Sequence, residues 1–206
     1  MIAIVDYEAG NLTSVKRALD FLEIESKITP DPSEIIGAER VIFPGVGHAS
    51  AAMAVLKSRG IDFALREVFR KGTPLMGICL GTQIILGSSV EGDTECLGII
   101  EGVCPRFILK DPSLKIPHMG WDSIKLLRDH PVLEGVVPTD EFYFVHSFYP
   151  QPVNSADVIA VCEYEMEFPA IIGRANLVAT QFHPEKSGQA GLRILKNFSR
   201  WDGLSC

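Results

Sequence analysis

The sequence is poor in basic residues and has no cluster of them. Its 206 residues include 19 lysines and arginines against 26 aspartates and glutamates, a formal net charge of −7. A surface with this balance has no basic patch with which to hold nucleic acid or an anionic membrane. We expect a small molecule or another protein as partner, and no nucleic acid or membrane.

Cysteines and long apolar runs are also scarce. The five cysteines, at positions 79, 96, 104, 162 and 206, form no Cys-x-x-Cys spacing, which argues against a disulfide framework and a zinc knuckle. The opening apolar run stops at Asp6, too short for the core of a signal peptide, and no later run approaches a membrane span. We therefore expect a cytoplasmic protein in a reducing compartment.

The composition predicts one folded domain over residues 1–206. Hydrophobic residues make up 47% of the sequence and charged residues 22%, as in soluble globular proteins. The first half alternates strand and helix patterns, with strands expected at 2–5, 25–28 and 40–43 and helices at 49–59 and 62–70. Such alternation forms right-handed βαβ units, so we predict an α/β fold with a parallel sheet.

The second half is expected to be richer in strands. After a predicted loop at 88–93, short runs typical of strands occur at 103–107, 123–126, 142–145, 158–162 and 170–173. A last strand is predicted at 177–181, followed by a closing helix over 188–201.

One stretch, Pro74 to Gln83, has the pattern of a nucleophile. An apolar run ends in Cys79, and Gly77 and Gly81 flank it two residues away on either side. This is the spacing of a nucleophile elbow, in which a sharp strand-to-helix turn lifts the reactive side chain clear of the sheet. A helix over residues 80–86 would favour the thiolate and could bind an oxyanion. A buried structural cysteine is the alternative.

A cysteine nucleophile needs a base and a group that orients the base. His183 and Glu185 follow the last predicted strand, and Pro184 between them holds His183 extended, so both can point to the same side of the sheet edge. The other histidines lack an adjacent carboxylate. We interpret His130 as a surface loop residue and expect hydrogen-bonded or core positions for the remaining three, His48, His118 and His146.

A glycine turn, residues 44–47, directly follows the third predicted strand. The carboxyl ends of parallel strands are where ligands bind, but the turn lacks a Walker lysine and is a weak phosphate loop. Beside a cysteine elbow, it can supply a backbone N–H to an oxyanion. An ordinary glycine turn is the alternative.

These motifs resemble those of the class I (triad) glutamine amidotransferases, whose nucleophile motif is Gly-x-Cys-x-Gly-x-Gln and whose base motif is His-Pro-Glu. Residues 77–83 and 183–185 match both. Within this class, the Pro-His-Met-Gly-Trp segment at 117–121 and Tyr-Phe-Val-His-Ser at 143–147 resemble the glutaminase subunits of imidazole glycerol phosphate synthase. The resemblance implies a flavodoxin-like fold, with a mostly parallel sheet flanked by helices and an additional antiparallel β portion.

The resemblance also implies a reaction, glutamine hydrolysis to glutamate and ammonia, without metal or organic cofactor. Cys79 would attack the side-chain amide, His183 would transfer the proton and Glu185 would orient His183. Further roles are implied for the oxyanion residues Gly45, Val46 and Leu80, and for the glutamine-holding residues Gly47, Gln83, Ser147 and Phe148.

The implied partner is a (βα)8-barrel cyclase subunit of histidine biosynthesis, which would receive the ammonia within a heterodimer. Its contacts would fall on Asn11, Met119, Trp121, Tyr143 and Lys186. From composition alone, residues 117–121 suit either a buried corner or an exposed recognition surface.

The sequence departs from the family pattern near the implied pocket and interface. Glu8 and Ala9 stand where the family often has a glycine-rich turn, and residues 84–87 replace a bulkier segment. Thr82 stands where methionine is usual, and Phe148 where tyrosine is common. Two alternatives stay open: a paralogous subunit that feeds ammonia to another synthase, and a stand-alone cysteine hydrolase. A binding module without activity has less support because the whole triad is present.

Overall fold

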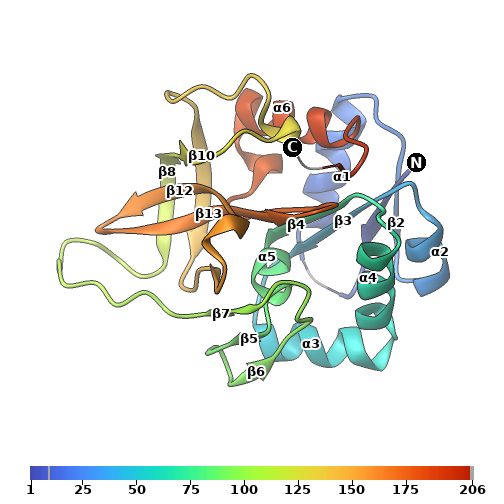
Figure 1. Cartoon of the computed structure of the whole chain (residues 1–206), viewed down its shortest axis with the longest axis horizontal. Helices are drawn as coiled ribbons and strands as arrows, with labels where there is room; N and C mark the ends of the chain where they lie inside the picture. The colour runs from blue at the N-terminus through green and yellow to red at the C-terminus, as the bar shows by residue number, and fades with distance from the viewer. Residues whose placement is uncertain (9, 205–206) are drawn as a thin grey trace.

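The computed structural model describes residues 1–8 and 10–204, and an eight-stranded sheet runs through its centre (Figure 1). Five neighbouring strands are parallel: β2 (Ser26–Thr29), β1 (Ile2–Val5), β3 (Arg40–Gly45), β4 (Leu75–Cys79) and β14 (Leu177–Thr180). The sheet continues antiparallel through β13 (Met166–Arg174), β12 (Val158–Tyr164) and β9 (Lys125–Leu126). The predicted α/β fold with a parallel sheet is confirmed.

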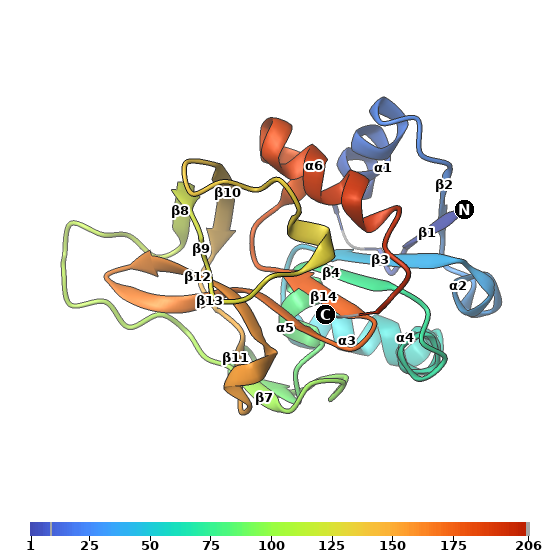
Figure 2. The same ribbon diagram turned by 45° about the horizontal axis from the view of Figure 1, so that its top comes forward.

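Helices cover both faces of the parallel strands (Figure 2). One face carries α1 (Leu12–Phe21) and α6 (Gly188–Phe198), and the other carries α2 (Pro32–Gly37), α3 (Ala49–Ser58) and α4 (Ile61–Arg70). Alternate residues of one strand serve the two faces, since Ile2 and Ile4 join one core cluster and Ala3 and Val5 the other. Burial on both faces explains why these strands are continuous apolar runs.

The antiparallel portion includes a separate two-stranded sheet of β8 (His118–Ser123) and β10 (Glu141–His146), which lies beside the β12–β13 pair in Figure 1. A four-stranded sheet is formed by the short strands β11 (Gln151–Pro152), β7 (Gly102–Cys104), β5 (Ser88–Ser89) and β6 (Thr94–Glu95). In β8, exposed residues alternate with buried or half-buried ones, so one face is packed and the other meets solvent.

Several predicted boundaries were wrong. The strand expected over 123–126 is divided between the end of β8 at Ser123 and β9, which belong to different sheets. Residues 88–93 are not all loop, because Ser88 and Ser89 pair with β6 and β7 through their backbones, which a polar sequence without periodicity does not reveal. The strand expected over 103–107 stops at Cys104, and the elbow helix, α5 (Leu80–Ile84), is shorter than predicted. The closing helix ends at Phe198, and Trp201 is instead buried beyond its last turn.

Within residues 1–8 and 10–204, no helix combines the length and the apolar character needed to cross a membrane.

Candidate active site

Cys79 lies at the end of β4, directly before α5, in a strained backbone conformation with φ 53° and ψ −107°. The adjoining glycines leave no room for side chains. A Cβ on Gly81 would lie 2.0 Å from the carbonyl oxygen of Phe43, and one on Gly77 would lie 2.6 Å from Cδ1 of Ile85. The sharp strand-to-helix turn predicted around Cys79 is therefore present, and close packing against β3 and against Ile85, which follows α5, is the reason for its glycines.

His183 and Glu185 form the expected pair in the turn after β14. Nδ1 of His183 lies 2.8 Å from Oε1 of Glu185, and the same oxygen accepts a hydrogen bond of 2.5 Å from Nδ2 of Asn11. A carboxylate only accepts, so His183 donates from Nδ1. Its Nε2 is buried without a hydrogen-bond partner, which leaves that nitrogen free to exchange a proton with a reacting group.

The electrostatics favour a proton on His183. Burial alone would lower the pKa of His183, but its contacts with Cys79 and Glu185 outweigh burial and raise that pKa to about 10. Burial raises the pKa of three other thiols, to about 11 for Cys96, to about 12 for Cys162 and well above the usual value for Cys104. These three cysteines are therefore protonated structural thiols, and among the described cysteines Cys79 is the one that lines a cavity together with a histidine, His183.

A cavity of about 340 Å³ opens in front of Cys79, within the range of small-molecule sites. It brings together eight residues predicted for the site: Val46, Gly47, Cys79, Leu80, Gln83, Ser147, Phe148 and His183. Gly45 is in register with Cys79 on β3 behind the cavity wall, and the buried Glu185 carboxylate stands behind His183.

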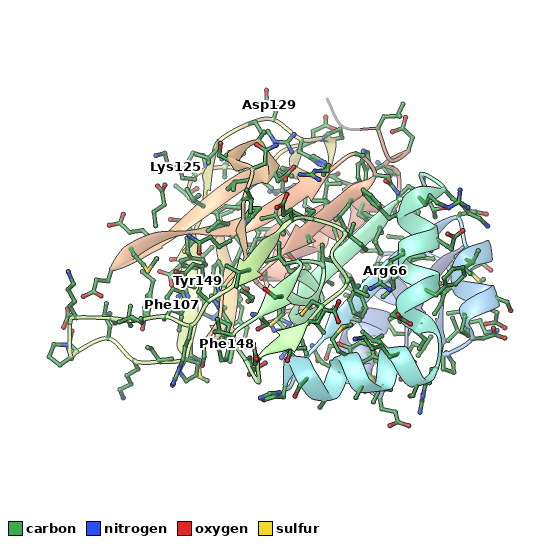
Figure 3. All side chains as sticks on the ribbon, turned by 60° about the horizontal axis from the view of Figure 1, so that its bottom comes forward. Arg66, Phe107, Lys125, Asp129, Phe148 and Tyr149 are labelled. Carbon is green, nitrogen blue, oxygen red and sulfur yellow. The ribbon has the colours of Figure 1, made fainter. Side chains whose placement is uncertain are left out.

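A hydrogen-bonded row of amides stands at one wall of this cavity, where Gln83 and Phe148 line it and the buried Gln181 lies behind them. Nε2 of Gln83 donates to the carbonyl oxygen of Phe148 at 2.9 Å and to Oε1 of Gln181 at 3.1 Å. Nε2 of Gln181 in turn faces Sγ of Cys79 at 3.8 Å. Phe148 lies beside Phe107 and Tyr149 in Figure 3, where two irregular segments run antiparallel. The row fixes the Phe148 peptide near Cys79.

Four lining residues were missed from the sequence: Glu91, Pro117, Val145 and His146. Oε2 of Glu91 accepts a 2.7 Å hydrogen bond from the backbone N–H of Ala49, at the N-terminus of α3. The loop predicted at 88–93 gave no signal for Glu91, because its position depends on the β5–β6 pairing.

The residues expected at an interface form an exposed aromatic group. Met119 is 62% exposed and Trp121 50% exposed, which rejects the buried-corner alternative. Trp121 lies edge-on to Tyr143 with ring centroids 5.8 Å apart, and Nζ of Lys186 lies 5.7 Å from the centre of the Tyr143 ring. Asn11 is partly buried and contacts Glu185, so within this chain it holds the carboxylate that faces His183.

The interpretation of His130 was wrong. It is 5% exposed, with its ring packed edge-on against Trp201 and its Nδ1 accepting from the N–H of Val132. The cause is the burial of Trp201 beyond α6, which the sequence did not show. His48 is exposed rather than a core residue, and it caps α3 through Ser50. His118 and His146 are buried and hydrogen-bonded, as expected.

The departures from the family pattern lie in different places. Thr82 and residues 84–86 are buried, and Oγ1 of Thr82 donates to the carbonyl oxygen of Thr180 at 2.6 Å, so these belong to the core and not to the pocket or an interface. Phe148 lines the cavity. Glu8 forms an ion pair with Arg59, and Ala9 lies outside the described residues.

Groups of three or more His, Cys, Asp or Glu side chains placed to hold a metal ion do not occur in the described part of the chain.

Comparisons with known proteins agree with this geometry. The family model described as "Glutamine amidotransferase class-I" matches residues 3–200. Imidazole glycerol phosphate synthase subunit HisH of Nitratidesulfovibrio vulgaris is 52% identical over 98% of this chain and 96% of its own length. The same subunit of Dehalococcoides mccartyi is 45% identical, with 96% of each chain covered.

Solved structures share the fold at low sequence identity. A crystal structure titled as a glutamine amidotransferase superposes with a TM-score of 0.76 at 19% identity, covering 98% of this chain and 99% of its own. A chain in the structure of PurLQS from Thermotoga maritima gives a TM-score of 0.72 at 18% identity, with 97% of each chain covered. With an elbow cysteine, a buried histidine–glutamate pair and this degree of identity, the chain belongs to the class-I glutamine amidotransferases and, among them, to the HisH subunits of imidazole glycerol phosphate synthase.

Proposed function

We propose that the chain is the glutaminase subunit of an imidazole glycerol phosphate synthase and that it supplies ammonia to a cyclase subunit. The observation that carries the proposal is the placement of Cys79 and His183 on one cavity, with Glu185 and Asn11 behind the histidine. This arrangement suits acyl transfer from an amide.

The reaction follows from the roles of these groups. The Cys79 thiolate adds to the side-chain amide carbon of glutamine, and the protonated His183 gives its proton to the leaving nitrogen, so that ammonia departs and a thioester remains. His183 then takes a proton from water, which attacks the thioester and releases glutamate. Glu185 keeps Nδ1 of His183 protonated and the ring in place throughout.

The oxyanion of each tetrahedral intermediate needs N–H donors. Leu80 opens α5 next to Cys79, and the turn at Gly45, Val46 and Gly47 adjoins the same cavity. Gly47 has φ 107°, a conformation that glycine adopts readily, so this turn can rotate a peptide N–H toward the oxyanion or away from it. We expect low glutaminase activity from the isolated chain, because one absent donor costs on the order of 3 kcal/mol of transition-state stabilisation.

Glutamine would be held by Gln83, Gly47 and the backbone of Ser147 and Phe148, all of which line the cavity. The proposed partner is a (βα)8-barrel cyclase that docks on the exposed aromatic group of Met119, Trp121, Tyr143 and Lys186 to form a heterodimer. Exposed tryptophan and methionine side chains are characteristic of interface centres.

Co-purification with a histidine-pathway cyclase subunit, followed by glutamate release with and without the cyclase substrate, tests the proposal. We expect a stable complex, release that the substrate stimulates, and ring closure driven by ammonium when Cys79 is replaced. A paralogous subunit would be stimulated by a different synthase. A stand-alone hydrolase would turn over glutamine quickly with no partner, and that result would reject the proposal.

A further inference from the structure

Two buried histidines connect the surface of the β8–β10 sheet to the cavity wall. His118 and His146 are cross-strand neighbours, 1% and 5% exposed, and Nδ1 of His118 lies 3.2 Å from Nε2 of His146. At the outer end, Nε2 of His118 lies 2.6 Å from Oδ2 of Asp122, whose side chain is partly exposed. At the inner end, Nδ1 of His146 lies 2.8 Å from the carbonyl oxygen of Phe148.

The hydrogen-bond partners at the two ends of this row determine which ring nitrogens carry protons. The Phe148 carbonyl only accepts, so Nδ1 of His146 carries a proton. If Asp122 is ionised it also only accepts, so Nε2 of His118 carries a proton. Two neutral rings would then face each other with bare lone pairs at 3.2 Å, which is repulsive. The row is satisfied only if a further proton lies between the two rings.

The charge of this proton is balanced within the row. With Asp122 ionised, the shared proton makes one imidazolium and the group of three is neutral. With Asp122 protonated, its proton is donated to Nε2 of His118, and His118 donates from Nδ1 to His146. Both arrangements place three protons on the three side chains and one of them on a facing nitrogen. Burial opposes a charge here by lowering the pKa of both histidines, and Asp122 counteracts burial at His118.

The surroundings hold the two rings in this arrangement. His118 stacks on Phe144 at 5.0 Å and on Tyr164 at 4.1 Å between ring centroids, so it has little freedom to rotate. Titratable groups near the row include Tyr164, stacked on His118, Cys162, beside Asp122, and His183, near His146. The Phe148 carbonyl accepts from His146 and from Gln83, so the row and the amide wall meet on one peptide of the cavity.

We propose that Asp122, His118 and His146 are positioning residues that share one proton between the two imidazoles and thereby fix the Phe148 peptide for glutamine binding. The role in binding rests on the proposed function, whereas the shared proton does not. Asparagine at position 122 can replace the carboxylate without charge: its amide donates to Nε2 of His118, which then donates from Nδ1 to His146. Leucine cannot make this bond and leaves the row broken.

The shared proton is tested by NMR on the full chain labelled with ¹⁵N-histidine, which identifies the protonated nitrogens of each ring. We expect a proton on Nδ1 of His118 or on Nε2 of His146, in addition to Nδ1 of His146. Bare facing nitrogens on both rings would overturn the proposal. This measurement needs no activity, so it stands even if the chain proves not to be a glutaminase.

The positioning role is tested by steady-state kinetics of the assembled complex at saturating partner. Asp122→Leu should raise the glutamine KM about tenfold with a smaller change in kcat, as expected for the loss of a buried hydrogen bond. Asp122→Asn should keep the glutamine KM at the wild-type value. Glu141→Leu, which removes an exposed acid from the neighbouring strand, is the matched control and should change nothing. An Asn variant as impaired as Leu, or a Leu variant with unchanged KM, would overturn the role.

Discussion

Strands β1 and β4 are buried along their whole length on both faces, whereas β8 and β10 are buried mainly on one. Strands β1 and β4 both lie in the parallel part of the molecule, and β4 ends at Cys79. The second pair, β8 and β10, belongs to the antiparallel part. Its packed side supplies His146 to the cavity, while its open side carries Met119, Trp121 and Val145, the last of which also lines the cavity.

The two parts contribute different properties to the site. The parallel strands hold Cys79 in a strained turn through packing on every side, which makes its geometry insensitive to the surface. The β8–β10 sheet touches both the cavity and solvent. The two parts are joined at His183, because its backbone N–H donates to the carbonyl oxygen of Tyr143 in β10 at 3.0 Å.

The strongest test of the parallel part is removal of Cys79, its proposed nucleophile. Cys79→Ala should reduce glutamate formation on the order of 10⁴-fold or more, while association with the partner and ammonium-driven ring closure continue. Glutamate release and ring closure, measured on the same complex, check this. Cys96→Ala, which removes a thiol that is equally buried but remote from the base, is the control and should stay active.

The rigidity of the elbow is tested by adding one methyl group. Gly81→Ala would place Cβ 2.0 Å from the Phe43 carbonyl oxygen, so we expect the free energy of unfolding to fall by about 3 kcal/mol. Gly37→Ala at the end of α2, where nothing lies within 4 Å, should be nearly neutral. Chemical denaturation compares the two variants, and equal stability would mean that the elbow is not tightly packed.

The role of the open side of the β8–β10 sheet in partner binding is tested by replacing an exposed and a buried tryptophan. Trp121→Ala should weaken partner association by about 2 kcal/mol and leave the melting temperature of the isolated chain almost unchanged. Trp201→Ala removes a buried ring and should destabilise the chain by about 3–5 kcal/mol. Thermal melts and a binding titration separate the two, and a large loss of stability in Trp121→Ala would reject the interface assignment.

The interaction of Cys79 with His183 is tested by pH. The folded-state pKa of His183 is raised above its unfolded value, so the stability from its proton is complete below about pH 6.5 and is lost as pH rises toward about 10. Buried thiols lose stability in the same direction, so the difference between variants is the informative quantity. We expect Cys79→Ala, which removes one cause of the raised pKa, to show a smaller decline from pH 7 to pH 10 than the wild type. Equal declines in denaturant titrations would contradict the pairing of Cys79 with His183.

The sequence was sufficient to predict the features that neighbouring residues form by themselves. The elbow and the His-Pro-Glu turn are short runs of neighbouring residues, and double-sided burial leaves continuous apolar strands. Met119 and Trp121 were assigned to a surface only through a family resemblance, and residues alone left their burial open.

Features that depend on long-range register could not be predicted. Asn11 and Glu185 are 174 residues apart, and their contact exists only because α1 begins beside the turn after β14. The row from Asp122 to Phe148 needs the exact pairing of β8 with β10, and a shift by one residue would turn His118 away from His146. Glu91 likewise reaches the cavity through two strands of two residues each.

The contrast between Cys79 and the other described thiols has a practical consequence for chemical labelling. Cys96, Cys104 and Cys162 are sealed in the interior as protonated thiols, while Cys79 opens onto a cavity beside a base. An electrophile shaped like glutamine would therefore alkylate the folded chain at Cys79 ahead of these three. The stoichiometry of adducts, read by mass spectrometry of the digested protein, would then report the fraction of molecules with an assembled site.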